Sequence, residues 1–392
     1  MTDIYFQEEL DRLEAAGNYR RLMPAEHSGC DVVIGGRRML DLSSNDYLGL
    51  AADIGLRKEF MAGLSPENFQ MSSSSSRSLS GDFPVHEQVE RQLAAMFGRE
   101  AALVFNSGYH MNIGILPAIA GKDTLIVADK LVHASLIDGI RLSGAPFCRF
   151  RHNNTEHLEA VLSREYGKYR QIIIVVESVY SMDGDRADLE RICRLKDIYD
   201  NVSVYVDEAH AFGVMGEIGL GLAEELNCLA DIDYICGTFG KALGSVGGFI
   251  VCSATVRKYL INRMRPFIFS TALPPLNWMW TSWLLDRLPA MKPLRSHLAS
   301  VSAVLRDALV SYGLEMPSDT HIVPVITGES SRAVSLAGRL QDKGFFVLPV
   351  RPPTVPEGSS RLRLSLTANM SPDRIESLIK VLEDEMQLAD KK

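Results

Sequence analysis

The stretch VSVYVDEAHAFG, residues 202–213, places an acidic residue directly after an apolar run. Four of its first five residues are Val or Tyr, a composition typical of a strand that is buried on both faces. Asp207 marks the point where this strand ends and a turn begins. Ligands of α/β proteins collect outside the carboxyl ends of parallel strands. The stretch therefore predicts a buried strand with a ligand site beside Asp207 and His210.

Apolar runs of the same kind recur along the chain and alternate with segments of helical spacing. The runs are AALVFNSGY (101–109), DTLIVAD (123–129), QIIIVVES (171–178), DYICGTFGK (233–241) and GGFIVC (247–252). This β-α-β rhythm predicts an α/β fold with a mostly parallel central sheet. We expect a large domain at residues 45–288 and a smaller α+β domain at 289–392. Residues 1–44 are expected to form an N-terminal helix and a short strand segment.

Composition and charge narrow the class of protein. The chain has 392 residues, 46% of them hydrophobic, and a net charge of −8, which disfavours nucleic acid as a partner. Its six cysteines contain no CxxC pair, so reduced thiols are expected rather than a disulfide framework or a metal site. No apolar stretch approaches the roughly 20 residues that span a bilayer. We therefore expect a cytoplasmic enzyme that binds no metal, nucleic acid or membrane.

The letters DEAH at Asp207–His210 also occur in helicase-type ATPases, which need a G-x-x-x-x-G-K-[ST] phosphate loop. The Gly-Lys pairs at residues 121–122, 167–168 and 240–241 all lack the upstream glycine and the following Ser or Thr. An ATPase is therefore a remote alternative. What remains is Lys241 in TFGKALG (238–244), 34 residues after Asp207 (241 − 207).

An aspartate and a lysine at neighbouring strand ends suit pyridoxal phosphate. The lysine forms a Schiff base with the cofactor's aldehyde, and the carboxylate keeps the pyridine nitrogen protonated. Gly240 and Gly244 allow the backbone to approach a ring closely. A lone lysine is more often a solvated surface residue, so the interpretation depends on the joint placement of Asp207 and Lys241.

Nine segments resemble, in order and over nearly the whole chain, the α-oxoamine synthases. They are LSSNDYLGLA (42–51), NSGYHMNIGIL (106–116), DKLVHASLIDGIRLS (129–143), FRHNN (150–154), VESVYSMDGD (176–185), VDEAHAFGVMGEIGLG (206–221), GTFGKALGSVGGFI (237–250), FSTALPP (269–275) and RLRLSLTA (361–368). Members of this family are fold-type-I, aminotransferase-like pyridoxal phosphate enzymes. They condense an amino acid with an acyl thioester and release CO₂.

The resemblance also suggests substrates. The first, second and fourth segments are most similar to the family members of biotin synthesis, which use L-alanine and a pimeloyl thioester carried by CoA or acyl-carrier protein. Members that use glycine with acetyl-CoA or succinyl-CoA, or serine with a long acyl thioester, are alternatives. A non-catalytic dimeric scaffold is a further alternative, and it would lack a cofactor attached to Lys241.

The resemblance implies roles for individual residues. Lys241 would form the Schiff base and then act as the base, Asp207 would pair with the pyridine nitrogen, and His133 would stack on the ring. His210 and Ser181 would contact the phenolic oxygen of the ring. The phosphate would be held by Ser107, Gly108, Tyr109 and Thr238, joined by Ser270 and Thr271 from the other subunit of a homodimer.

For the substrates, the resemblance implies that Arg363, with Asn45 nearby, binds the amino-acid carboxylate. Arg20 or Arg21 is a candidate for binding the distal carboxylate of a pimeloyl chain, although two arginines that end a helix more often form a solvated C-terminal turn. One segment departs from the family pattern, because MSSSSSRSLSGD (71–82) lacks the glycine-rich turn that members have before the position of Arg77. Its composition predicts a flexible surface turn, and the departure bears on acyl specificity.

Overall fold

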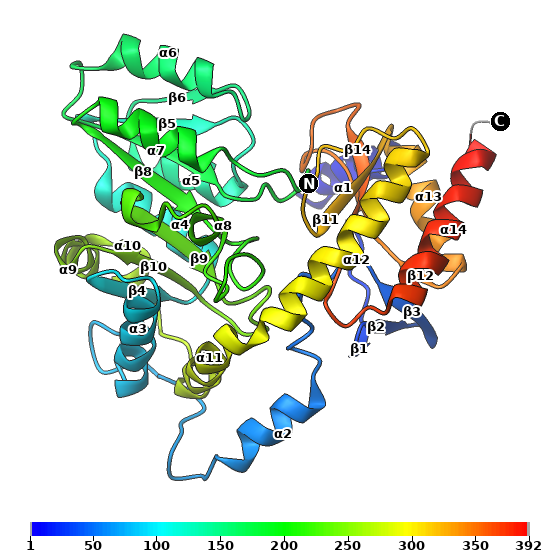
Figure 1. The fold of residues 1–392 in the computed structure, drawn as a ribbon, viewed down its shortest axis with the longest axis horizontal. Helices are drawn as coiled ribbons and strands as arrows, with labels where there is room; N and C mark the ends of the chain where they lie inside the picture. The colour runs from blue at the N-terminus through cyan, green and yellow to red at the C-terminus, as the bar shows by residue number, and fades with distance from the viewer. Residues whose placement is uncertain (1, 390–392) are drawn as a thin grey trace. The chain divides into compact units, whose positions relative to one another are not determined.

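The computed structural model describes residues 2–389 and contains two compact units (Figure 1). The large unit comprises Asp53–Tyr180 and Arg186–Arg295. The small unit comprises the described residues up to Ala52, the segment Ser181–Asp185, and the described residues from Ser296 onward. The domain boundaries expected from the sequence, after residues 44 and 288, stay a prediction.

A seven-stranded sheet organises the large unit, and β10 alone among its described strands runs antiparallel to its neighbours. In spatial order the strands are β4 (Ala101–Phe105), β10 (Gly248–Cys252), β9 (Tyr234–Thr238), β8 (Val202–Asp207), β7 (Gln171–Glu177), β5 (Thr124–Asp129) and β6 (Phe147–Phe150). The predicted α/β fold with a mostly parallel sheet is confirmed.

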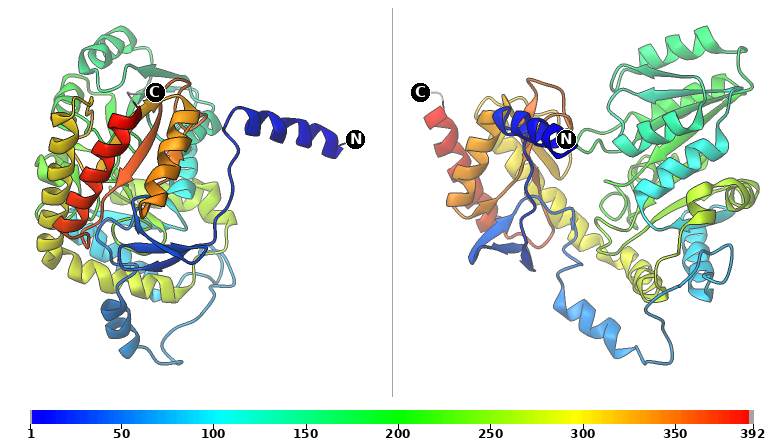
Figure 2. Two further views of the ribbon diagram at one scale, coloured as in Figure 1. Left: turned by 90° about the vertical axis from the view of Figure 1, so that its right-hand side faces the viewer. Right: turned by 180° about the vertical axis from the view of Figure 1, so that it is seen from behind.

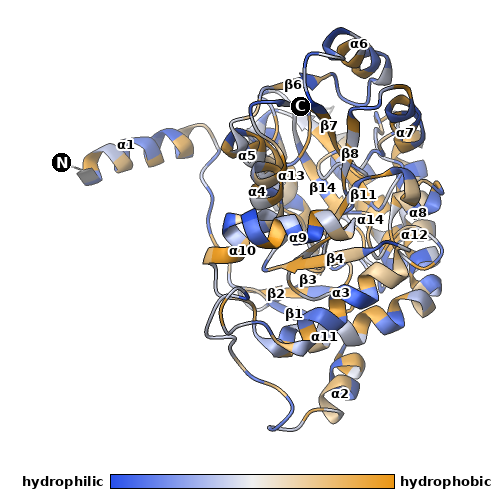
Figure 3. Ribbon diagram, turned by 90° about the vertical axis from the view of Figure 1, so that its left-hand side faces the viewer, coloured by the Kyte–Doolittle hydropathy of each residue, from blue (hydrophilic) through white to orange (hydrophobic). Residues whose placement is uncertain are grey.

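The central strands are apolar because both of their faces are covered. Every residue of β4, β5, β8 and β10 is buried, and Figure 3 shows β4, β7 and β8 largely in hydrophobic colours. Burial of one large apolar side chain contributes about 1.5–3 kcal/mol relative to leaving it in water. A sheet held in this way fixes the positions of the polar residues that follow its strands.

Helices connect these strands and cover the sheet. The helical elements are α2 (Ile54–Ala62), α3 (Pro84–Met96), α4 (Gly108–Ile119), α5 (Ala134–Ser143), α6 (Thr155–Glu165), α7 (Leu189–Ile198), α8 (Leu222–Glu225), η1 (Leu229–Asp231), α9 (Ala254–Arg263), α10 (Arg265–Phe269), α11 (Pro275–Arg287) and η2 (Leu288–Met291). Two of them begin at residues of the expected site. Ser107 caps the N-terminus of α4 and His133 caps that of α5.

The small unit contains two sheets with helices. The four-stranded sheet has the order β1 (Glu26–Ser28), β2 (Asp31–Ile34), β3 (Arg37–Asp41) and β12 (Phe345–Phe346), and the three-stranded sheet has the order β11 (Ile322–Gly328), β14 (Ser360–Ser365) and β13 (Pro349–Val350). Its helices are α1 (Thr2–Ala15), most of α12 (Lys292–Ser311), α13 (Ser330–Asp342) and α14 (Pro372–Ala389). Helix α1 stands apart from the rest of this unit (Figure 2), and Ile4, Tyr5 and Phe6 are exposed.

The serine-rich segment lies at the surface, as its composition predicts, and Met71, Ser74 and Leu79 are among its exposed residues. Two of its serines are exceptions. Ser73 and Ser76 are only 4% and 7% exposed. These two serines pack against the rest of the large unit, where Ser73 Oγ donates to the Leu273 carbonyl and the Ser75 carbonyl accepts from the Ala272 amide. The flexibility of the segment stays a prediction. The six cysteines are free, as expected. Within residues 2–389 no helix is both long and apolar enough to cross a membrane.

Candidate active site

Four strands of the large sheet end in polar or acidic residues at one edge. Strand β5 ends at Asp129, β7 at Glu177, β8 at Asp207 and β9 at Thr238. The register pairs Glu177 with Asp207, so these two carboxyl groups end adjacent parallel strands. The polar and acidic residues that follow the apolar runs of the sequence therefore lie along one edge of the sheet.

Lys241 and His210 meet beyond this edge. The Nζ atom of Lys241 lies 2.9 Å from Nε2 of His210. The turn that carries Lys241 is closed by a hydrogen bond from the Gly244 amide to the Lys241 carbonyl. Gly213 has a φ of +86°, and a Cβ atom there would lie 2.7 Å from the Cβ of Ala242. Only glycine lets the turns after β8 and β9 approach so closely, which brings His210 and Lys241 together.

Asp207 is buried in a hydrogen-bond network. Its Oδ2 accepts a bond from Asn112 Nδ2 at 2.8 Å, and its Oδ1 accepts one from the Ala209 amide at 3.0 Å. Asn112 Nδ2 also donates to Ser135 Oγ at 2.9 Å, while its Oδ1 accepts from Tyr205 at 2.6 Å. These bonds fix the orientation of the Asp207 carboxylate.

Asn112 and Ser135 were missed from the sequence. A signal was present, because Asn112 is a polar residue on the buried face of the apolar helix α4. A buried amide must find partners, so its position predicts a polar neighbour. The identity of that neighbour depends on a contact across 95 residues, which local patterns do not reveal.

His133 begins helix α5 with its ring oriented by Ser135. Its Nδ1 accepts a hydrogen bond from the Ser135 amide and lies 2.8 Å from Ser135 Oγ. Burial lowers the pKa of His133 from its ordinary value, and the charge of Lys241 lowers it further, while Asp207 opposes both. With Nδ1 acting as an acceptor, the neutral ring carries its proton on Nε2.

The turn from β4 into α4 has the features of a phosphate site. Ser107 accepts a hydrogen bond from the His110 amide and begins a helix of 12 residues, whose N-terminus favours anions. A Cβ atom on Gly108 would lie 3.4 Å from the Cβ of Thr238, so Thr238 borders this turn. Tyr109 is turned to Asp138, and this hydrogen bond raises the pKa of the Tyr109 hydroxyl.

Glu177 is a second buried carboxyl beside Asp207. It is 2% exposed, and its Oε1 has no hydrogen-bond partner in residues 2–389. Burial, and then the charge of Asp207, raise the pKa of Glu177 to about 8, although Lys241 and the His133 amide oppose the shift. Asp129 adds to the increase. Burial and the neighbouring Asp207 carboxyl therefore favour the protonated, neutral form of Glu177.

This pKa predicts a pH-dependent difference in stability between wild type and a Glu177→Gln variant. Between its ordinary value of 4.5 and about 8, the folded protein holds a proton on Glu177 that the unfolded chain releases. The stability of wild type should therefore fall relative to the variant as pH rises through this window, by about 1.4 kcal/mol per pH unit. Urea unfolding of both cofactor-free proteins from pH 4.5 to 8.5 measures the difference. Exposed Glu190→Gln is the control, and equal pH dependence of the Glu177 variant and wild type would refute the assignment.

A cluster around Arg363 belongs to the small unit. Its Nη1 donates to Asn45 Oδ1 at 3.1 Å, its Nη2 donates to the Tyr47 hydroxyl at 3.1 Å, and its Nε donates to the carbonyl of Ser181. No carboxylate of the described residues lies within ion-pair distance of Arg363, whereas Arg361 pairs with Asp183. The structure thus brings Asn45, Ser181 and Arg363 together.

The remaining expected residues lie outside these two clusters. Ser270 and Thr271 follow helix α10 in the large unit. Arg21 lies on the small unit, beyond the end of α1, and its exposed guanidinium pairs with Glu14 at 3.2 Å. Arg20 instead donates to the Pro352 carbonyl at 3.4 Å.

The residues of the large unit fit pyridoxal phosphate. We call the turn at Ser107, Gly108 and Tyr109 the phosphate cradle. A Cβ atom on Gly248 would lie 3.0 Å from the Cα of Gly108, so glycine at residue 248 lets β10 approach the cradle closely. A lysine amine, an oriented aspartate and a capped helix N-terminus are the groups that the cofactor's aldehyde, pyridine nitrogen and phosphate require.

Comparison with known proteins gives the same family. A model of the aminotransferase class I and II family matches residues 37–382. A Pasteurella multocida protein, provisionally named 8-amino-7-oxononanoate synthase, is 51% identical over 381 residues, which are 97% of this chain and 98% of that protein. The 8-amino-7-oxononanoate synthase of Haemophilus ducreyi is 49% identical over 385 residues, which are 96% of this chain and 100% of that protein.

A solved structure agrees with the fold. A lysine-to-alanine variant of serine palmitoyltransferase from S. paucimobilis, with a bound aldimine of pyridoxal phosphate and myriocin, superposes with a TM-score of 0.90 at 30% identity. The match covers 99% of this chain and 98% of that structure. The chain belongs to the class I and II aminotransferase family and, within it, to the pyridoxal phosphate-dependent α-oxoamine synthases, which are acyltransferases.

Proposed function

We propose that this enzyme condenses L-alanine with a pimeloyl thioester, carried by CoA or acyl-carrier protein, to give 8-amino-7-oxononanoate, CO₂ and the free thiol in biotin synthesis. The observation that carries the chemistry is the 2.9 Å approach of Lys241 Nζ to His210 at the edge that also holds Asp207. The choice of substrates is supported by relatives named 8-amino-7-oxononanoate synthase, whose sequences are 51% and 49% identical to this one over nearly the whole chain. We also propose that the enzyme is a cytoplasmic homodimer.

Pyridoxal phosphate, when bound, supplies an aldehyde that attaches the amino acid covalently and a ring that withdraws electrons from its Cα. We propose that Lys241 holds the aldehyde and Asp207 the pyridine nitrogen, while His133 stacks on the ring. His210 and Ser181 are proposed to contact its phenolic oxygen. The proposed phosphate ligands are Ser107, Gly108, Tyr109 and Thr238, with Ser270 and Thr271 of a second subunit.

Lys241 is the proposed base for the Cα proton of the amino acid. An amine can accept this proton only when it is neutral and oriented toward the carbon. His210 helps the orientation, since its Nε2 lies within hydrogen-bond distance of Lys241 Nζ. His133, neutral with a proton on Nε2, is proposed to hold the carboxylate or to protonate a reaction intermediate.

Arg363 is the proposed ligand of the amino-acid carboxylate. Its guanidinium is held by neutral oxygen atoms of Asn45, Tyr47 and Ser181, so it keeps a full positive charge for a ligand. The neighbouring Arg361 is less suited, because Asp183 already neutralises it.

A second group of arginines supports recognition of a dicarboxylic acyl chain. Arg351 is partly buried, and both its burial and the charge of Arg20 lower its pKa. Two guanidiniums near one another favour an anion between or beside them. No acid of the described residues forms an ion pair with Arg20 or Arg351. We propose that Arg20, Arg21 and Arg351 attract the distal carboxylate of the pimeloyl chain.

An assay of product formation and of thiol release tests the proposal directly. Purified enzyme is supplied with L-alanine, glycine or L-serine, each combined with pimeloyl-, heptanoyl-, acetyl-, succinyl- or palmitoyl-CoA. We expect L-alanine with pimeloyl-CoA to give the highest kcat/KM and a product with the mass of 8-amino-7-oxononanoate. Heptanoyl-CoA has the same chain length without the distal carboxylate and should be a poor donor. Preference for L-serine with palmitoyl-CoA would replace the proposal by a serine palmitoyltransferase activity.

A further inference from the structure

The segment Thr271–Leu273 is held by partners distant in sequence. Asn106 Nδ2 donates to the Thr271 carbonyl at 2.7 Å, and Asn106 Oδ1 accepts from the Leu273 amide at 3.2 Å. The side-chain amide of Asn106 thus donates one hydrogen bond to this segment and accepts one from it, as the backbone of a neighbouring β-strand would do. The segment connects α10 to α11 and follows Ser270 directly.

The serine-rich segment holds the other side of Thr271–Leu273. The Ala272 amide donates to the Ser75 carbonyl at 3.0 Å, and Ser73 Oγ donates to the Leu273 carbonyl at 2.7 Å. Together with Asn106, these bonds engage two amides and two carbonyls over three residues. We name Asn106, Ser73 and Ser75 the clamp.

The serine-rich segment is itself rigidly placed. The Gly81 amide donates to the Ser76 carbonyl at 3.0 Å, and a Cβ atom on Gly81 would lie 2.2 Å from the Ser75 carbonyl oxygen. Arg77 donates to Glu90 at 2.5 Å, and Glu90 also accepts bonds from the Val104 amide and from Arg257. Arg77 thus attaches the segment to Glu90 of α3, which in turn binds β4 and α9.

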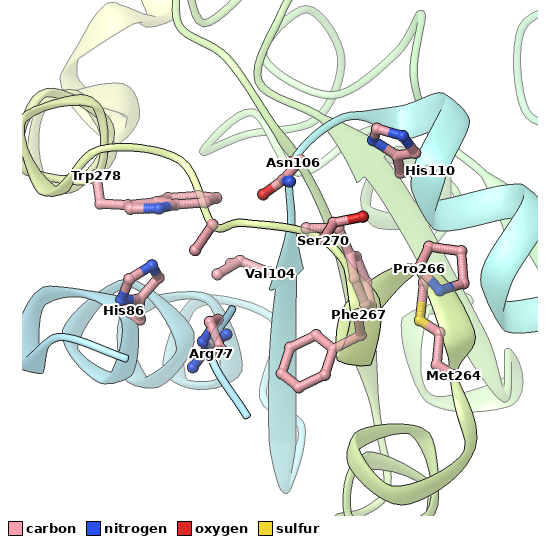
Figure 4. Close-up of a pocket in the computed structure, with 12 residues that line it drawn as sticks. Arg77, His86, Val104, Asn106, His110, Met264, Pro266, Phe267, Ser270 and Trp278 are labelled. Atoms are coloured by element: carbon pink, nitrogen blue, oxygen red, sulfur yellow. The ribbon is translucent and has the colours of Figure 1, made fainter. Parts of the chain in front are cut away.

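Asn106 lies in the short connection between strand β4 and helix α4. It lies between the last residue of β4 and Ser107, the capping residue of the proposed phosphate cradle. Figure 4 shows Asn106 at the end of β4, and Ser270 near it, among the side chains that line one pocket of the large unit. The same short stretch therefore starts the cradle and holds the residues after Ser270.

We propose that Asn106 is a positioning residue for cofactor phosphate binding. Its amide locks Thr271–Leu273 to the turn that starts α4, so that the hydroxyls of Ser270 and Thr271 are presented in one fixed place. This inference rests on the proposed function, in which those hydroxyls reach the phosphate bound by the other subunit of a homodimer. The serine-rich segment thereby has a structural role in place of the glycine-rich turn of the family.

Comparison of pyridoxal phosphate with pyridoxal tests the clamp, because pyridoxal lacks the phosphate. Cofactor-free full-length wild type, Asn106→Leu and Asn106→Asp are titrated with each compound, and binding is followed by protein fluorescence. The aspartate keeps the acceptor for the Leu273 amide but cannot donate to the Thr271 carbonyl. We expect both variants to bind pyridoxal phosphate about tenfold more weakly, the effect of losing one or two hydrogen bonds, with pyridoxal affinity unchanged. Asn262→Leu, which removes an amide bonded only within α9, is the control.

Hydrogen exchange supplies an independent measurement. In Asn106→Leu the Leu273 amide loses its acceptor and should exchange faster, whereas the Ala272 amide keeps the Ser75 carbonyl. Ser73→Ala serves if Asn106→Leu fails to fold, and it should show the same selective loss of pyridoxal phosphate affinity to a smaller degree. Unchanged affinity, or an equal loss for both compounds, would overturn the proposal. Failure of wild type to bind pyridoxal phosphate would instead contradict the proposed function.

Discussion

Replacement of Lys241 by alanine is expected to abolish covalent attachment of the cofactor and to lower kcat by about 10⁴-fold or more. The variant loses the nucleophile that holds the aldehyde and the base that accepts the Cα proton, and a positioned base alone contributes about 10²–10⁴-fold. Borohydride reduction followed by mass spectrometry of the peptide that contains residue 241 measures attachment. Thiol release measures kcat.

The control for this variant is Lys258→Ala. Lys258 is an exposed lysine on α9, so both readouts should match wild type. Noncovalent binding of pyridoxal phosphate to Lys241→Ala should persist, because the cradle at Ser107 and Gly108 is unchanged. A cofactor mass retained on the reduced Lys241→Ala protein would show that another amine is the attachment site.

Local patterns were sufficient to predict the sheet and its polar edge. The buried strands at 124–129, 171–177 and 202–207 are mostly apolar, and an acidic residue ends each of them. A residue that ends a buried parallel strand lies at the carboxyl edge of the sheet, where ligands of α/β proteins bind. The positions of Asp207 and Lys241 therefore followed from sequence, although their roles came from a resemblance and stay proposals.

Contacts between side chains far apart in sequence were not predictable in the same way. The pairing of Asn112 with Asp207 and the clamp of Asn106 on Thr271–Leu273 depend on how helices and loops pack after the sheet has formed. Serine-rich composition indicates low hydrophobicity, but it does not show that Ser73 Oγ finds a buried carbonyl 200 residues away. Composition therefore predicted a surface segment but did not reveal which of its serines are buried.

Replacement of Asp207 by asparagine should lower kcat by about 10²–10³-fold while the cofactor stays covalently bound. The change removes the negative charge that would keep the pyridine nitrogen protonated, and loss of one preorganised electrostatic partner costs about this much in other active sites. Single-turnover loss of deuterium from Cα-deuterated L-alanine isolates the step. It should slow in proportion to kcat.

The geometry around Asp207 decides how this variant must be interpreted. Asp207 accepts bonds from both Asn112 Nδ2 and the Ala209 amide, so an asparagine must point its own amide hydrogens at one of these donors. A second variant, Asn112→Asp with Asp207→Asn, exchanges the acid and the amide and so restores their hydrogen bond, but it leaves the charge displaced. If lost charge is the cause, the double variant should recover stability against urea and remain slow in proton removal. Recovery of the rate as well would show that orientation rather than charge at residue 207 is what the reaction requires.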